Sequence, residues 1–293
     1  MQKQTLIRSE EIKRVIPLSP GRQLSLSRPL VMGILNVTPD SFSDGGLYET
    51  IDKAVEHALA MEADGADIID VGGESTRPGA EAVPEPEELT RVIPVVKALK
   101  AHLRVPISID TCKSEVALAA LDAGAEIVND ISALRHDPAM AKIIADKKVP
   151  VVLMHMLGTP RDMQVKPEYK DCVKEIYEFL EERVAFAVSA GIDKSKIVVD
   201  PGIGFGKRLL DNIEILTNIA RFKELDLPVL IGASRKSFIG MLHPDGSLPH
   251  QRLGGSIAAA VAATLNGADI LRVHDVPETV EALKVIQALK EIK

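Results

Sequence analysis

The sequence predicts an α/β protein whose main domain is a single (β/α)8 barrel of the TIM type, preceded by a short N-terminal extension. Strand-like apolar segments and helical segments alternate eight times from residue 30 onward, which implies a parallel sheet with right-handed crossovers. The eight units occupy about 260 residues, the size of a closed barrel. Four glycines stand between a helix and the next strand, where a C-cap favours positive φ. They are Gly65, Gly124, Gly191 and Gly267.

Each expected strand is a short apolar run that a polar residue follows. The strands are expected at 30–36, 67–71, 106–110, 126–129, 149–155, 196–200, 228–232 and 268–273. The helices are expected at 51–64, 86–102, 114–123, from about 138, at 167–190, from 210, at 252–266 and from 277. We assign 29–293 to the barrel and 1–28 to the extension. A turn at Pro20-Gly21-Arg22 predicts a hairpin in that extension, which would close one end of the barrel.

Charge and composition exclude several classes of function. Lys and Arg total 35 against 42 Asp and Glu, a net charge of −7 with no dense basic run, so nucleic acids and anionic membranes are poor partners. The chain lacks both a signal-peptide core and a run of ~20 apolar residues. Cys112 and Cys172 have no metal-binding spacing and predict free thiols in a reducing compartment. We therefore expect a cytoplasmic protein without structural zinc.

Polar residues close all eight expected strands, and in such barrels the active site lies at the carboxyl ends of the strands. One polar residue in this position is often only a turn former or a helix cap. Eight that converge are costly to desolvate unless a ligand or one another satisfies them. In chain order they are Asn36, Asp70, Asp110, Asn129, His155, Asp200, Ser234-Arg235-Lys236, and Arg272 with His274.

The chemistry of these side chains indicates two kinds of ligand. Carboxylates accept paired N–H groups, a carboxamide both donates and accepts, and a lysine donates to a ring carbonyl or nitrogen, so one group suits a flat polar heterocycle. The residues after the eighth strand suit an anion, because the last two loops are the usual phosphate site of this fold. The heterocycle group is Asp110, Asn129, Asp200 and Lys236, and the anion group is Arg272 and His274.

Three polar, glycine-rich loops follow expected strands. The first, 37–46, is longer than usual βα connections and carries Asp44 before two glycines, which favours a functional loop. The second spans 70–79. The third, 200–207, has three glycines, but it is neither G-x-G-x-x-G nor a Walker A loop, because Arg208 stands where Ser or Thr should follow the lysine.

Together these segments resemble the dihydropteroate synthase family over about residues 28–290. The resemblance is carried by Asn36-Val-Thr-Pro-Asp-Ser-Phe-Ser-Asp-Gly-Gly46, Gly72-Gly-Glu-Ser-Thr-Arg-Pro-Gly79, Asp110, Asn129-Asp130, Asp200-Pro-Gly-Ile-Gly-Phe-Gly206, Ser234-Arg-Lys-Ser237 and Arg272-Val-His-Asp275. It implies a homodimeric (β/α)8 enzyme of folate synthesis. Such an enzyme joins 6-hydroxymethyl-7,8-dihydropterin pyrophosphate to p-aminobenzoate with Mg²⁺ and releases pyrophosphate.

The resemblance also implies roles for particular residues. The pterin would be held by Asp110, Asn129, Asp200 and Lys236; the pyrophosphate by Asn36, Arg272 and His274; and p-aminobenzoate by Thr76, Arg77, Phe205 and Ser237. Asn36 would also bind the metal, an oxygen ligand that suits a hard cation. Asp44, Lys236 and Arg272 would be catalytic. Departure of pyrophosphate would leave a delocalised cation that a carboxylate stabilises, while the first two loops exclude water.

Three other readings remain open at this point. A pterin-binding methyltransferase barrel would share the pterin pocket, but it has no use for a pyrophosphate clamp. A non-catalytic pterin-binding paralogue would keep the same pocket without turnover. A Schiff-base aldolase would use Lys236 as its nucleophile, but such a lysine belongs in an apolar pocket, and here Arg235 and Ser237 flank it.

Overall fold

The structure, a computed structural model, describes residues 14–19, 21–38, 47–77, 79–243 and 245–291. Eight parallel strands form one sheet in the order β8-β7-β6-β5-β4-β3-β10-β9. A parallel bridge between Val199 and Val229 joins the two outer strands and closes the ring. The strands are β3 (Leu30–Asn36), β4 (Ile68–Gly72), β5 (Ile107–Asp110), β6 (Ile127–Asp130), β7 (Val151–Met154), β8 (Ile197–Asp200), β9 (Leu230–Ile231) and β10 (Ile270–Val273). The predicted barrel is confirmed.

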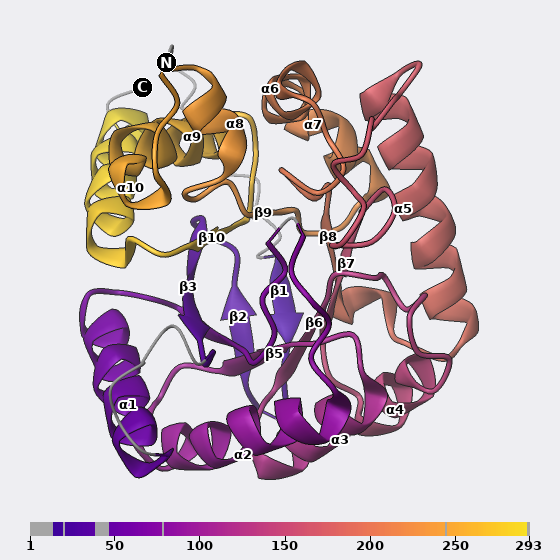
Figure 1. The fold of residues 1–293 in the computed structure, drawn as a ribbon, viewed down its shortest axis with the longest axis vertical. Helices are drawn as coiled ribbons and strands as arrows, with labels where there is room; N and C mark the ends of the chain where they lie inside the picture. The colour runs from indigo at the N-terminus through magenta and orange to yellow at the C-terminus, as the bar shows by residue number, and fades with distance from the viewer. Residues whose placement is uncertain (1–13, 20, 39–46, 78, 244, 292–293) are drawn as a thin grey trace, which may run out of the picture.

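Helices surround the ring of strands (Figure 1). They are α1 (Leu47–Ala63), α2 (Glu85–His102), α3 (Ser114–Ala123), α4 (Met140–Lys147), α5 (Cys172–Ser189), α6 (Leu209–Thr217), α7 (Ile219–Phe222), α8 (Ser237–Met241), α9 (Leu253–Leu265) and α10 (Val276–Glu291). The four glycines expected at helix ends all have positive φ, between 95° and 118°. Within the described residues, no helix is both long and apolar enough to cross a membrane.

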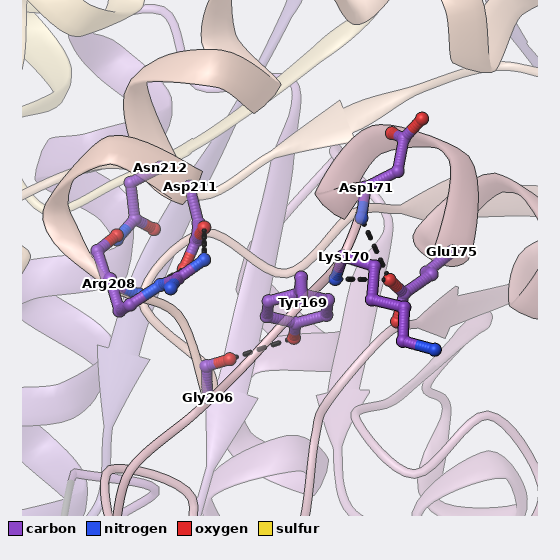
Figure 2. A network of polar contacts seen from close by, with 8 residues as sticks. All are labelled: Tyr169, Lys170, Asp171, Glu175, Gly206, Arg208, Asp211 and Asn212. Carbon is purple, nitrogen blue, oxygen red and sulfur yellow. Dashed lines mark hydrogen bonds and ion pairs between the residues drawn. The ribbon is translucent and has the colours of Figure 1, made fainter.

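Three helical details differ from the expectation, and the first is that α1 begins at Leu47 rather than at residue 51. Helix α5 begins at Cys172 rather than near residue 167, because Asp171 caps it by accepting the Lys174 N–H at 3.1 Å. The Glu175 carboxylate in turn accepts the N–H groups of Lys170 and Asp171, which stabilises this helix start (Figure 2). The short helices α7 and α8 were not expected, and α8 begins directly after Lys236.

Side chains in each strand alternate between the barrel interior and the surrounding helices, as the pleat of a strand requires. Ile69 and Val71 of β4 belong to the large core shared with the helices, whereas Ile68 packs inside the barrel. Asp70, two residues beyond Ile68, therefore also faces inward. The same spacing makes Asp200 inward after Val198, Asn129 after Ile127, and Arg272 after Ile270.

An antiparallel hairpin of β1 (Val15–Pro17) and β2 (Gln23–Ser25) lies across the ring in Figure 1. Its Ile16, Leu18 and Leu24 pack against the first inward residues of the barrel strands. Those residues are Leu30, Met32, Ile68, Ile127, Val152, Val198, Leu230 and Ile270. The hairpin thus closes the amino end of the barrel, as predicted, and leaves the carboxyl end for a site.

Candidate active site

Five inward residues converge at the carboxyl end of the barrel, and we call the face that they form the mouth. They are Asp70, Asp110, Asn129, Asp200 and Arg272, and all but Arg272 are buried. Arg272 donates from Nε to Asp70 Oδ2 and from Nη2 to Asp110 Oδ2, each at 2.6 Å. Asn129 Nδ2 also donates to Asp70 Oδ2, at 3.0 Å. Strand parity therefore brings residues from β4, β5, β6 and β10 into one hydrogen-bonded cluster.

Burial sets the charge balance of this cluster. Burial raises the pKa of Asp110 to about 7, although the Arg272 guanidinium opposes the shift. It likewise raises the pKa of Asp200 to about 6, and it lowers the pKa of Lys236 to about 8. Burial alone would lower the pKa of Arg272, but the Asp70 and Asp110 carboxylates outweigh it and raise that pKa. A ligand that donates N–H groups to the Asp110 and Asp200 carboxylates would replace the hydrogen bonds from water that burial removes.

Lys236 meets an apolar wall on one side. Its Nζ lies 3.9 Å from the centroid of the Phe205 ring, a cation–π contact. Phe205 packs with Ile131, Met154, Met156 and Met163 in a separate buried cluster. A planar ring that enters the mouth would thus find carboxylates and an amide at its polar edge and an apolar surface beside it.

The glycine-rich loop 201–206, which carries Phe205, is held from several sides. Asp200 Oδ1 accepts the Gly202 N–H at 2.7 Å, and Asn212 Oδ1 accepts the Gly204 N–H at 2.6 Å. Tyr169 donates from its hydroxyl to Gly206 O at 2.8 Å, while Arg208 pairs with Asp211 at the start of α6 (Figure 2). A Cβ on Gly202 would lie only 1.9 Å from His155 O, so its glycine permits close backbone packing.

The end of β10 presents a neutral histidine beside the mouth. Ser234 Oγ accepts the His274 backbone N–H at 3.2 Å and lies within hydrogen-bonding distance of His274 Nδ1, at 3.0 Å. This contact fixes the orientation of the ring and directs Nε2 away from Ser234. Burial first, and then Arg235 and Arg272, lower the pKa of His274 to about 3, while Arg235 pairs with Asp275.

Asn36 ends β3 and is half-buried beside the end of β4. Its Oδ1 lies 3.9 Å from the point that a Cβ on Gly72 would occupy. Mg²⁺ is usually held by one or two protein oxygens together with phosphate oxygens and water, so one neutral carboxamide oxygen at the mouth fits that cation. Across the described residues, no group of three His, Cys, Asp or Glu is placed to hold a metal by itself.

The remaining expected site residues lie on loops or helix ends. Thr76 is half-buried and Arg77 is exposed on the loop between β4 and α2. Lys113 Nζ donates to Glu74 of that loop and to the buried Glu88 of α2, and it thereby tethers the loop to the helix. Ser237 is the first residue of α8. Asp44 lies outside the described residues, and no hydrogen bond between described residues joins Thr76 or Arg77 to the mouth.

Strand parity corrects one expectation at the mouth. His155 was expected among the converging strand ends, but β7 ends at Met154, and His155 packs edge-on against Phe179 of α5 at 4.8 Å. Met154, one residue earlier, faces inward instead and belongs to the apolar wall beside Phe205. The sequence placed Asp70 and Ser234 among the converging strand ends but assigned a ligand to neither, and it gave no role to Lys207. The period-two pattern of β4 could have shown that Asp70 faces inward, whereas its bond with Arg272 also depends on strand register.

Comparison with known proteins agrees with this geometry. A family model described as pterin binding enzyme matches residues 32–274. The dihydropteroate synthase of Escherichia coli K12 is 51% identical over 273 residues, which cover 93% of this chain and 96% of that one. The structure of Xanthomonas albilineans dihydropteroate synthase with 4-aminobenzoic acid is 52% identical, with a TM-score of 0.88 over 95% of this chain and 98% of that chain.

A second Xanthomonas albilineans structure, in complex with 7,8-dihydropteroate, is 49% identical and has a TM-score of 0.84 over 94% of this chain and 99% of that chain. Relatives of this similarity, aligned over nearly the whole of both chains, show the family as well as the fold. The two free thiols, the barrel and the hairpin that closes it are all compatible with that assignment. This chain belongs to the dihydropteroate synthase family of pterin-binding enzymes.

Proposed function

We propose that the mouth of the barrel is where this chain joins 6-hydroxymethyl-7,8-dihydropterin pyrophosphate to p-aminobenzoate, the dihydropteroate synthase reaction of folate synthesis. The single observation that carries this assignment is the convergence of buried carboxylates, an amide and a lysine beside an apolar wall. Relatives solved with 4-aminobenzoic acid and with 7,8-dihydropteroate support it, since these are the second substrate and the product.

In this proposal Asp110, Asn129, Asp200 and Lys236 bind the pterin. The carboxylates accept ring N–H groups, and these bonds favour the charged carboxylate that burial disfavours. Because Asn129 Nδ2 already donates to Asp70, its carboxamide is oriented before the ligand arrives. The pterin ring is flat and can lie against the apolar wall that Phe205 forms with the neighbouring methionines.

The pyrophosphate is assigned to Asn36, Arg272 and His274 at the ends of β3 and β10. His274 contributes the ring nitrogen Nε2, because Nδ1 is already in contact with Ser234. Arg272 contributes positive charge, which Asp70 and Asp110 hold in place at 2.6 Å. Mg²⁺, with Asn36 as a protein ligand, would supply charge that stabilises the departing pyrophosphate.

The chemistry requires a clamped leaving group more than an enzyme nucleophile. As pyrophosphate departs from the pterin methylene, positive charge spreads into the electron-rich ring, and fixed negative charge nearby stabilises that transition state. The aniline nitrogen of p-aminobenzoate is a neutral nucleophile that needs positioning. We assign that positioning to Thr76, Arg77, Phe205 and Ser237, and we assign the charge on the first loop to Asp44.

Release of pyrophosphate from the dihydropterin substrate, measured with and without p-aminobenzoate, tests the assignment. We expect release that depends on the arylamine. A methyltransferase barrel or a non-catalytic paralogue would bind the pterin without arylamine-dependent release, and that outcome would overturn the proposal. An aldolase would form a borohydride-trapped adduct on Lys236.

Asp44 receives a separate test because its role is kinetic. A charge that acts only near the transition state changes turnover and the specificity constant together. We expect Asp44→Asn to lower kcat by roughly tenfold, about 1.4 kcal/mol, with pterin pyrophosphate affinity within about twofold of the original. A loss confined to substrate binding would remove Asp44 from the catalytic residues.

We also propose that the chain forms a homodimer in the cytoplasm. Helix α9 contains no charged residue, although Leu253 and Leu265 at its two ends are exposed, and a helix that is apolar on all sides is normally covered. Leu210 of the adjacent α6 is 73% exposed. Light scattering should give twice the chain mass, and Leu265→Glu should shift it toward the monomer. The two free thiols support a reducing compartment.

A further inference from the structure

Lys207 is a fully buried lysine that has no role in the reaction described above. It directly follows the glycine-rich loop 201–206, and only 2% of its surface is exposed. Burying an ammonium group is costly unless it is hydrogen-bonded on several sides. Burial lowers the pKa of Lys207 to about 7, while Cys172 and Asp200 act in the opposite direction. A side chain kept at such a cost needs a structural or functional reason.

The contacts of Lys207 join two strand ends. Its Nζ donates to Phe205 O at 2.9 Å and to His155 O at 3.4 Å, and it lies 3.0 Å from His155 Nδ1. Burial, with the nearby Lys207, holds the pKa of His155 well below its usual range, so the ring is neutral. Its Nδ1 then accepts from the ammonium, and the ring is fixed edge-on against Phe179. Lys207 thereby ties the loop after β8 to the residue after β7.

The carbonyl that Lys207 holds belongs to the residue beneath Lys236. Phe205 lies between two glycines, so its own neighbours restrict its backbone little. The flanking carbonyls are held by Gln164, which bonds Gly204 O, and by Tyr169, which bonds Gly206 O (Figure 2). Each of these two partners holds one carbonyl of the loop, whereas Lys207 Nζ contacts the Phe205 carbonyl, the His155 carbonyl and the His155 ring, and so fixes Phe205 to the end of the neighbouring strand.

We propose that Lys207 is a positioning residue for the pterin site, which acts by holding the Phe205 carbonyl so that the Phe205 ring supports Lys236. This inference rests on the proposed function, because it treats Lys236 as a pterin ligand. It makes Lys207 part of the binding machinery although it does not touch the substrate. The effect of removing Lys207 should therefore depend on whether Phe205 is present.

A double-mutant cycle between Lys207→Met and Phe205→Leu tests that dependence. Calorimetry with the dihydropterin pyrophosphate should show a roughly tenfold loss of affinity for Lys207→Met in the original chain. In the Phe205→Leu background the same change should alter affinity by less than twofold. Because the contact acts on binding, KM should rise by the same tenfold while kcat stays within about threefold. Equal losses in both backgrounds, or no loss in the original chain, would overturn the proposal.

One control and one replacement variant keep the result decisive. Lys170 is an exposed lysine near the start of α5, and its side chain points away from the loop in Figure 2. Lys170→Met should leave the affinity for the dihydropterin pyrophosphate unchanged. Should Lys207→Met not fold, Lys207→Met combined with His155→Leu removes the ring acceptor together with the lysine, so that only backbone carbonyls lose a donor. The pair leaves the Phe205 carbonyl free, so the same cycle applies. An original chain that fails to bind the pterin would instead overturn the proposed function.

Discussion

The two ends of this barrel are built from the same strands, yet they differ completely in chemistry. At the amino end Ile68, Ile127, Val198 and Ile270 point inward and pack beneath the hairpin. Two residues further along those strands, the inward positions are Asp70, Asn129, Asp200 and Arg272. Two residues along each strand therefore separate the polar mouth from an apolar amino end, and we call this end, together with the hairpin that covers it, the plug.

This difference separates stability from activity along the barrel axis. The plug gains its free energy from apolar burial, which needs no partner of particular chemistry. The mouth keeps buried charges that only one another and a ligand can satisfy, which is a poor way to stabilise a fold. We therefore expect changes at the plug to alter folding alone, and changes at the mouth to alter binding, with a loss of stability as well where a buried charge loses its partner.

The largest effect is expected at Arg272. Arg272→Met leaves Asp70 and Asp110 buried without their common partner, and breaking a buried ion pair costs about 3–5 kcal/mol. Binding of the pterin pyrophosphate should fall at least a hundredfold, which is about 2.7 kcal/mol. Urea unfolding measures the first effect and calorimetry the second. The pterin without pyrophosphate should weaken much less, and equal weakening of both ligands would make Arg272 a pocket-shaping residue only.

Arg28 gives a matched control at the other end of the barrel. It bonds the Asp67 carboxylate at 2.6 Å just before β4, but it is largely exposed. Exposed ion pairs contribute about 0–1 kcal/mol, so Arg28→Met should change stability within that range and leave ligand binding unchanged. A loss as large as that of Arg272→Met would show that the two ends do not differ as described.

Ile16 tests the plug directly. Only 1% of its surface is exposed beneath the barrel, and Ile→Ala changes in such positions cost about 2–5 kcal/mol through lost burial and the cavity left behind. Thermal or urea unfolding should show this loss. Pterin affinity of the folded fraction should stay within twofold of the original, whereas a coupled loss of affinity would mean that the plug also shapes the mouth.

Asp200 tests the mouth with a smaller change. Asp200→Asn replaces an acceptor with a donor that faces the ring N–H groups, and leaving such a bond unmade costs at least about 1–3 kcal/mol. Pterin affinity should fall at least tenfold while the fold is kept, because Asn still offers an oxygen to the Gly202 N–H. If calorimetry showed unchanged affinity for the pterin, Asp200 would not be a pterin-binding residue.

The barrel could be predicted from the sequence because each strand and helix is indicated by the pattern of its own residues. The run from Leu30 to Asn36 and the helix from Ser114 to Ala123 were located to the residue. It did not reach the internal bonds of the mouth, such as Arg272 with Asp70, because those depend on strand register around the ring. His155 was misplaced for the same reason: it is polar and follows a strand, but its parity points it outward.

The last expected effect is a pH dependence of stability that separates the two ends of β8. Asp200, at the carboxyl end, has a pKa raised to about 6 by burial, so the folded chain holds a proton that the unfolded chain releases near pH 4. Its contribution to stability is fully present below about pH 4 and is lost as the pH rises through 6.

Asp200→Asn mimics the protonated acid and lacks this loss. The variant should match the original chain near pH 4 and exceed it in unfolding free energy near pH 7, by on the order of 1–3 kcal/mol. Asp193, before the amino end of β8, has a pKa lowered by bonds from Ser195, so its contribution is lost only as the pH falls below about 4. Asp193→Ala should therefore lose stability near pH 7 and match the original chain in stronger acid. Urea unfolding at several pH values measures both, and slopes of the same sign would contradict the assigned burial of Asp200.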